Sequence, residues 1–123
     1  MKKRLFFCIP FLLIMVFYYS CTKDKTAAPP DCSQLDSLNT YTNSVKPIMD
    51  NYCATVGCHD PLFASGGLVL DTYEHTANAA RNDGKFFCAI EWSCTPNMPN
   101  TGIKLADSLI AKIQAWKSNC YAQ

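Results

Sequence analysis

The segment Cys53-Ala54-Thr55-Val56-Gly57-Cys58-His59 is the most informative stretch of this 123-residue chain. Two thiols followed directly by an imidazole are suited to covalent haem attachment, in which the thiols reach two vinyl groups on one porphyrin edge and the histidine ligates the iron. The common spacing has two residues between the cysteines, whereas this chain has four. Gly57 can adopt a conformation that absorbs the extra backbone. We therefore predict one covalent haem c, attached to Cys53 and Cys58 and ligated by His59, around which the domain folds.

A second iron ligand follows by elimination. Beyond residue 20 the chain has only the methionines Met49 and Met98 and, besides His59, only the histidine His75. Met49 lies four residues before Cys53, too close in the chain to reach the opposite face of the haem. Met98 follows in a proline-stiffened loop and is the predicted ligand, although a methionine there could instead pack in the core. His75 has polar neighbours and is expected to be solvated.

The hydrophobic spacing predicts an all-α domain with long loops. Helices are expected over four segments, with Ser44 as N-cap of the first: 44–52, 72–80, 85–92 and 107–119. Glycine and proline mark 60–67 and 94–102 as loops. The short apolar piece 68–70 follows the first loop, and no segment shows the alternation of a strand. By helical phase, five apolar side chains would enclose the haem: Leu68, Leu70, Ile90, Ile113 and Trp116.

The N-terminus has the features of an export signal. Three basic residues precede an apolar run that ends at Ser20-Cys21, which is short for a membrane span. We predict a lipoprotein signal peptide over 1–20, lipidation of Cys21, a tether over 21–31 and a folded domain over 32–123. The alternatives are an uncleaved anchor and an unlipidated exported chain. In each case the domain would function outside the cytoplasm, facing the periplasm or the cell surface.

Charge and size limit the partners and the sources of stability. The full chain has a formal net charge of +1, and removal of the signal with its three basic residues leaves −2 and no basic block. Nucleic acid is therefore not an expected partner. A domain of this size closes one small hydrophobic core, so additional covalent fastening is expected.

Four cysteines remain once lipid and haem have used the other three of the mature chain: Cys32, Cys88, Cys94 and Cys120. An even number in an oxidising compartment indicates two disulfides. Of the three possible pairings, the shortest chain path favours Cys88 with Cys94 and Cys32 with Cys120. The alternative is that Cys88 and Cys94 bind zinc together with Cys53, Cys58 or His59.

Five separated segments resemble small c-type cytochrome domains of exported bacterial lipoproteins: Val45-Lys46-Pro47-Ile48-Met49, Cys53 to His59, Gly66 to Tyr73, Asn97-Met98-Pro99 and Ala111 to Trp116. The resemblance implies a cytochrome c fold, with first and last helices crossing around the haem. It also implies His59 as proximal and Met98 as distal ligand. Two features depart from the pattern: Ala106 stands where such chains often have a Ser or Thr cap, and four cysteines lie outside the haem motif.

With both axial positions occupied, the iron would have no open position for substrate or oxygen. The expected function is therefore single-electron transfer without catalysis, between redox donor and acceptor proteins and with the membrane as lipid anchor. Two alternatives remain open at this point. One is an open-site haem enzyme or sensor, and the other is a haem-free binding module held by disulfides.

Overall fold

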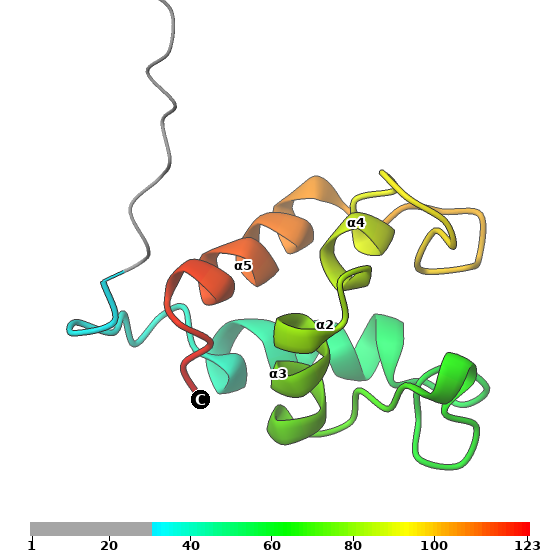
Figure 1. The fold of residues 1–123 in the computed structure, drawn as a ribbon, viewed down its shortest axis with the longest axis horizontal. Coiled ribbons are helices and arrows are strands. Elements are labelled where there is room, and N and C mark those ends of the chain that lie inside the picture. The colour runs from blue at the N-terminus through cyan, green and yellow to red at the C-terminus, as the bar shows by residue number, and fades with distance from the viewer. Residues whose placement is uncertain (1–30) are drawn as a thin grey trace, which may run out of the picture.

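The computed structural model describes residues 31–123, and within this range the chain forms helices and loops without strands. The predicted all-α class is thus confirmed. The elements follow in the order η1 (Tyr41–Val45), α2 (Lys46–Ile48), η2 (Met49–Cys53), η3 (Ser65–Gly67), α3 (Tyr73–Asn82), α4 (Phe86–Ile90) and α5 (Asp107–Ser118) (Figure 1). The predicted signal peptide, the predicted lipidation site Cys21 and all but the last residue of the predicted tether lie outside the described residues.

The first helical run comprises η1, α2 and η2 and continues unbroken over residues 41–53. It starts earlier than predicted, because Thr40 and not Ser44 is the N-cap, its side chain accepting a hydrogen bond from the Asn43 N–H. The turns before and after α2 are wider than α-helical turns, with bonds from the Lys46 N–H to the Tyr41 carbonyl and from the Ala54 N–H to the Met49 carbonyl. Pro47 lacks an N–H and crowds the preceding turn, which fits the wider turn before it.

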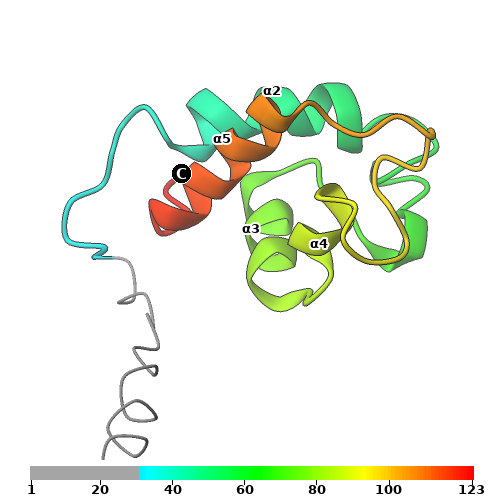
Figure 2. The ribbon, with the colours of Figure 1, turned by 90° about the horizontal axis from the view of Figure 1, so that it is seen from above.

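The core forms where α5 packs against the first helical run (Figure 2). Trp116 is fully enclosed, and its ring lies 5.8 Å from that of Tyr41. Val45 and Ile113 are also without solvent exposure. Because burial of large apolar side chains is the main driving force of folding, this contact between distant segments carries much of the stability.

The two ends of the domain are fastened together. Cys32 and Cys120 form a disulfide, as predicted. Beside it, Asn119 accepts a hydrogen bond at Oδ1 from the Asp36 N–H (2.7 Å), and its Nδ2 donates to the carbonyls of Asp36 (2.7 Å) and Asn39 (3.0 Å). All the hydrogen-bonding groups of a buried amide are thereby used, so the segment before the first helical run is held on the end of α5.

The predicted middle helices are both present with adjusted ends. In α3, Thr72 is the N-cap and accepts a hydrogen bond from the His75 N–H, as a helix starting at this residue requires. The following helix, α4, is shorter than the predicted 85–92 and comprises Phe86–Ile90. It ends because Trp92 adopts a left-handed conformation with φ of 60°.

Candidate functional site

Two long loops lie at one end of the molecule. One covers residues 54–72 around η3, and the other covers residues 91–106 (Figures 1 and 2). The fastened N- and C-terminal segments lie at the opposite end. The loops carry three of the four predicted haem-site residues, and Cys53 ends the helical run that leads into the first loop. The fold therefore brings the predicted site residues to the same end of the domain.

Cys53 and Cys58 are free thiols, and both are half-buried. Burial raises the pKa of the Cys53 thiol to about 11, and the nearby Cys58 adds to the effect. A thiol with such a pKa is almost fully protonated at neutral pH and is a poor nucleophile as it stands.

The backbone between the two thiols forms a compact turn. The His59 N–H donates to the Cys53 carbonyl (3.1 Å), and the Cys58 N–H donates to that of Thr55 (3.0 Å). Gly57 has a φ of 85° and nothing within 4 Å of where a Cβ would lie, so backbone conformation and not space explains the glycine here. The four intervening residues thus close back on Cys53, which places His59 next to both cysteines.

The His59 side chain has a defined orientation. Its Nδ1 lies 3.0 Å from the carbonyl oxygen of Leu68, which can only accept a hydrogen bond. Nδ1 must therefore carry the proton, and in the neutral ring the lone pair is on Nε2. The Leu70 N–H donates to the His59 carbonyl (2.9 Å), so backbone and ring are both fixed to the extended segment after η3. Such a second bond to the far nitrogen is what orients a metal-binding histidine.

Met98 lies in the second loop, half-buried against the hydrophobic core. Both of its backbone groups are used. Its N–H donates to the Ala89 carbonyl at the end of α4 (2.9 Å), and its carbonyl accepts from the Trp92 indole N–H (3.0 Å). The main chain of Met98 is therefore held at both its N–H and its carbonyl group, on either side of the Cα atom that carries the thioether side chain.

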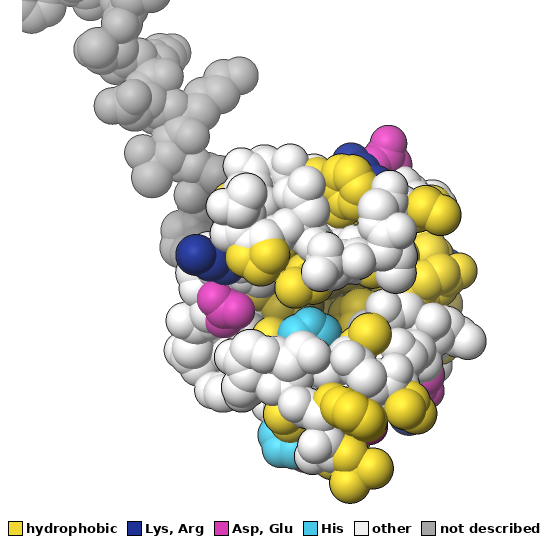
Figure 3. All heavy atoms as spheres, turned by 90° about the vertical axis from the view of Figure 1, so that its right-hand side faces the viewer, with side chains coloured by type: hydrophobic (Ala, Val, Ile, Leu, Met, Phe, Trp, Pro, Cys, Tyr) yellow, Lys and Arg dark blue, Asp and Glu magenta, His cyan; other side chains and the backbone are white. Residues whose placement is uncertain are grey.

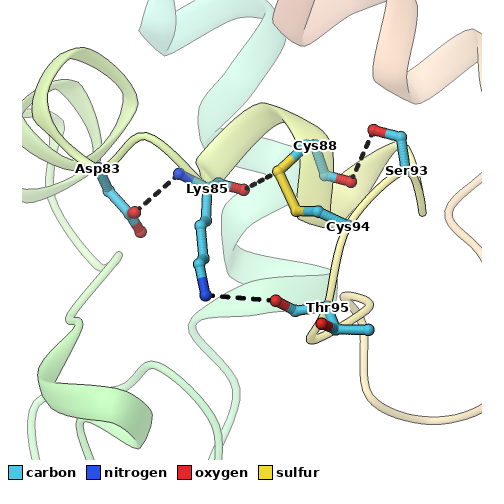
Figure 4. Close-up of a disulfide and its surroundings, with 6 residues drawn as sticks. All are labelled: Asp83, Lys85, Cys88, Ser93, Cys94 and Thr95. Carbon is cyan, nitrogen blue, oxygen red and sulfur yellow. Dashed lines mark hydrogen bonds between the residues drawn. A yellow bond between two sulfur atoms is a disulfide. The ribbon is translucent and has the colours of Figure 1, made fainter.

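The second predicted disulfide, Cys88–Cys94, links α4 to the loop that precedes Met98 (Figure 4). Ser93 bends back in the intervening turn, where its N–H donates to the Cys88 carbonyl (2.9 Å). Lys85 reaches across from the helix start to the Thr95 carbonyl (3.5 Å). Because both sulfurs are bonded to each other, the alternative in which Cys88 and Cys94 bind zinc is wrong.

Part of the predicted haem lining is wrong. Ile113 and Trp116 are sealed in the core under the first helical run and have no exposed surface. Helical phase alone correctly marked them as buried, but it could not tell a core position from a site-lining one. Leu70 and Ile90 are also core residues, whereas Leu68 is half-buried beside His59.

The loop end of the molecule is largely apolar, and the central parts of both loops are almost without charged residues. Four of its side chains are among the exposed large hydrophobic residues: Val56, Leu62, Phe63 and Ile103. Figure 3 views this end and shows hydrophobic side chains around a hollow with a histidine at its edge. Residues 92–103 contain no Lys, Arg, Asp or Glu, and residues 52–70 contain only Asp60, which is buried. The buried Asp60 carboxylate accepts a hydrogen bond from the Phe63 N–H (3.2 Å), so it stabilises the turn in which it lies.

Sequence reasoning missed two groups that orient the predicted ligands. The Leu68 carbonyl that fixes the His59 ring is a backbone atom, and any residue at that position would supply it. Trp92 could have been suspected as an aromatic residue near Met98 whose side chain donates a hydrogen bond without accepting one. Neither group leaves a sequence motif.

Comparison with known proteins gives no match: no protein-family model fits the chain, and no curated protein or solved structure is significantly similar to it. Within residues 31–123, no group of three or more His, Cys, Asp or Glu side chains could hold a metal ion. Four of the six cysteines there form disulfides. The resemblance to small c-type cytochrome domains is therefore wrong as a family assignment. The matching segments were short and separated, and helix packing and loop composition can produce such similarity without common family membership.

The two disulfides indicate an extracytoplasmic, oxidising environment. Among the described helices, none has the length and hydrophobicity needed to cross a membrane.

Proposed function

We propose that this protein is an electron carrier that binds one haem covalently through Cys53 and Cys58. The observation that carries the proposal is the orientation of His59. Its Nδ1 is committed to the Leu68 carbonyl, which leaves the Nε2 lone pair available on the residue that directly follows Cys58, and neither Cys53 nor Cys58 forms a disulfide. This proposal concerns the residues of this chain and does not depend on membership of any known family.

The donor set fits a haem. A porphyrin supplies four nitrogen ligands itself, so the protein needs only one or two axial groups and no cluster of three ligating side chains. His59 would provide the imidazole, and Met98 would provide the thioether sulfur. The exposed apolar side chains around these loops would suit a large, flat, mostly hydrophobic group.

The described residues also indicate how the chain would adjust electron transfer. Haem supplies a reversible one-electron couple when bound. A thioether ligand and largely apolar surroundings disfavour the extra positive charge of the oxidised form, which raises the reduction potential. The hydrogen bonds at His59 and Met98 would hold both ligands alike in the two states. A redox donor and a redox acceptor protein are the implied partners, and no catalysis is proposed.

The test is the intact mass of the protein produced in cells that can attach haem to proteins. We expect the wild-type chain to gain the mass of one haem. The double variant Cys53→Ala/Cys58→Ala should show no added mass. The matched control is Cys88→Ser/Cys94→Ser, which removes two cysteines outside the motif and should keep the gain. A colourless wild-type protein without added mass would contradict the proposal.

A second candidate is a haem-free binding module held by disulfides. The exposed side chains of Val56, Leu62, Phe63 and Ile103 favour it, because apolar residues gathered at one end of a small domain suit contact with a partner. The same mass measurement separates the two candidates, since only the haem carrier gains mass.

We also propose that Cys21 carries a lipid that anchors the protein to a membrane. The first described residues are held by the Cys32–Cys120 disulfide at the end opposite to the two loops (Figure 1). An anchor on this side would leave the loop end free to meet partners. Growth with a labelled fatty acid tests the idea: wild type should incorporate the label and Cys21→Ala should not.

A further inference from the structure

The geometry points to Trp92 as the positioning residue for the Met98 sulfur. The inference rests on the proposed function and identifies what holds the second ligand in place. The indole N–H of Trp92 donates to the Met98 carbonyl (3.0 Å), and this is a bond from a side chain that has no other hydrogen-bonding group.

Trp92 is itself held in an unusual conformation. Its φ of 60° places a bulky residue in the left-handed region, which a non-glycine residue seldom adopts without compensation. The backbone N–H of Trp92 donates to the Ala89 carbonyl (3.2 Å), and the same carbonyl accepts from the backbone N–H of Met98 (2.9 Å). The left-handed turn at the end of α4 therefore directs the indole back toward the loop, and Ala89 connects the two residues through the main chain.

The loop needs such a contact. Residues 95–103 make few backbone hydrogen bonds to the rest of the domain, and the Cys88–Cys94 disulfide fastens only their N-terminal side. A methionine side chain has three rotatable bonds, so the position of its sulfur depends on how firmly its backbone is fixed. The Trp92 indole holds the carbonyl group of Met98, and the Ala89 carbonyl holds the backbone N–H of Met98.

The variant Trp92→Phe keeps an aromatic ring and removes only the N–H donor, and Trp92→Tyr is a second variant of similar bulk if the first does not fold. The matched control is Tyr73→Phe, which keeps the ring and removes one bond, from the Tyr73 hydroxyl to the Tyr121 carbonyl (3.0 Å) at the C-terminus. Both substitutions delete one bond from a side chain to a main-chain carbonyl, but only the bond of Trp92 is made to Met98.

The first readout is competition on the haem-loaded ferric protein. Added imidazole can bind the iron only when the Met98 sulfur has left, so its apparent affinity reports how often the sulfur detaches. Loss of one neutral hydrogen bond should raise that affinity about fivefold in Trp92→Phe. Met98→Ala sets the upper limit of the effect, and Tyr73→Phe should match wild type.

The second readout is hydrogen exchange at the Met98 amide, which requires no haem. We expect exchange about fivefold faster in Trp92→Phe and unchanged in Tyr73→Phe. The inference is overturned if Trp92→Phe alters neither readout, or if it alters exchange but not imidazole affinity in the loaded protein. It is also overturned if Tyr73→Phe changes the two readouts as much as Trp92→Phe does. If the chain never gains haem, the proposed function fails, and the exchange rate alone decides whether Trp92 positions Met98.

Discussion

At the scale of single residues, the orientation of His59 links the sequence motif to its chemistry. The motif places an imidazole next to a cysteine, but only the bond from Nδ1 to the Leu68 carbonyl determines which nitrogen is free. A similar division holds at Met98, where the sequence supplies the sulfur and neighbouring groups hold its backbone. The role proposed for each residue thus depends on a partner that lies outside its motif.

The raised pKa of Cys53 predicts slow alkylation of the haem-free protein. With a pKa of about 11, roughly one thiol in a thousand is ionised at pH 8. Reaction with iodoacetamide should therefore be slow near neutrality and accelerate as the pH rises toward 11, as measured by mass spectrometry of the Cys53 peptide.

The variant Cys58→Ala serves as the control for this measurement. It removes the smaller cause of the raised pKa and leaves burial, the larger one, in place. We expect Cys53 to remain slow in this variant. Rapid reaction at pH 7 would show that the thiol is not buried in solution.

Substitution of Met98 tests its predicted role as the second ligand. In the haem-loaded protein, Met98→Ala should lower the reduction potential and change the absorption spectrum, because a sulfur ligand favours reduced iron. Met49→Leu is a suitable control, since Met49 is fully buried in the core and is expected to leave the spectrum unchanged. An unaltered spectrum and potential in Met98→Ala would exclude Met98 as ligand and favour an open-site haem protein.

At the scale of elements, helix existence was easier to predict than helix ends. The helices expected over 72–80 and 107–119 occur as α3 and α5, because the Thr72 cap of α3 and the spaced apolar side chains of α5 are local signals. The first helical run begins at Tyr41, whose N–H donates to the Ala122 carbonyl (2.7 Å), a contact with the other end of the chain. No local pattern could report such a contact.

The N-cap of α3 offers a test of local stability. Thr72→Ala removes the acceptor of the His75 N–H and should cost about 1 kcal/mol of the free energy of unfolding, measured by urea denaturation. The control is Thr42→Ala, an exposed threonine of the first helical run that caps no helix. A cost in Thr72→Ala no larger than in the control would exclude a capping role.

At the scale of the whole molecule, two disulfides fasten different parts of the fold. Cys32–Cys120 joins the ends of the domain with a sequence separation of 88, whereas Cys88–Cys94 closes a turn with a separation of 6. The longer bridge lies at the end remote from the two loops, and the shorter one lies next to the Met98 loop (Figure 4). The Cys32–Cys120 bridge is therefore expected to contribute most to the stability of the domain. The Cys88–Cys94 bridge is expected to restrict the motion of the loop that contains Met98.

Removal of each bridge by paired alanine substitutions tests this division. On the chain-entropy relation, loss of the long closure should cost about 4–5 kcal/mol and loss of the short one about 2 kcal/mol of the free energy of unfolding. Equilibrium urea denaturation of Cys32→Ala/Cys120→Ala and of Cys88→Ala/Cys94→Ala gives both values. Equal costs, or the reverse order, would contradict the assignment.

The sequence by itself determined the all-α class, the helices with local caps and, through the economy of chain path, both disulfide pairings. These features depend on spacing, capping and cysteine number, which are visible along the chain. Only the tertiary structure decided that Ile113 and Trp116 belong to the core, that His59 presents Nε2, and that Trp92 holds Met98. The physical reason is that burial and hydrogen-bond partners are set by segments distant in sequence, and backbone carbonyls that accept these bonds have no residue identity to read.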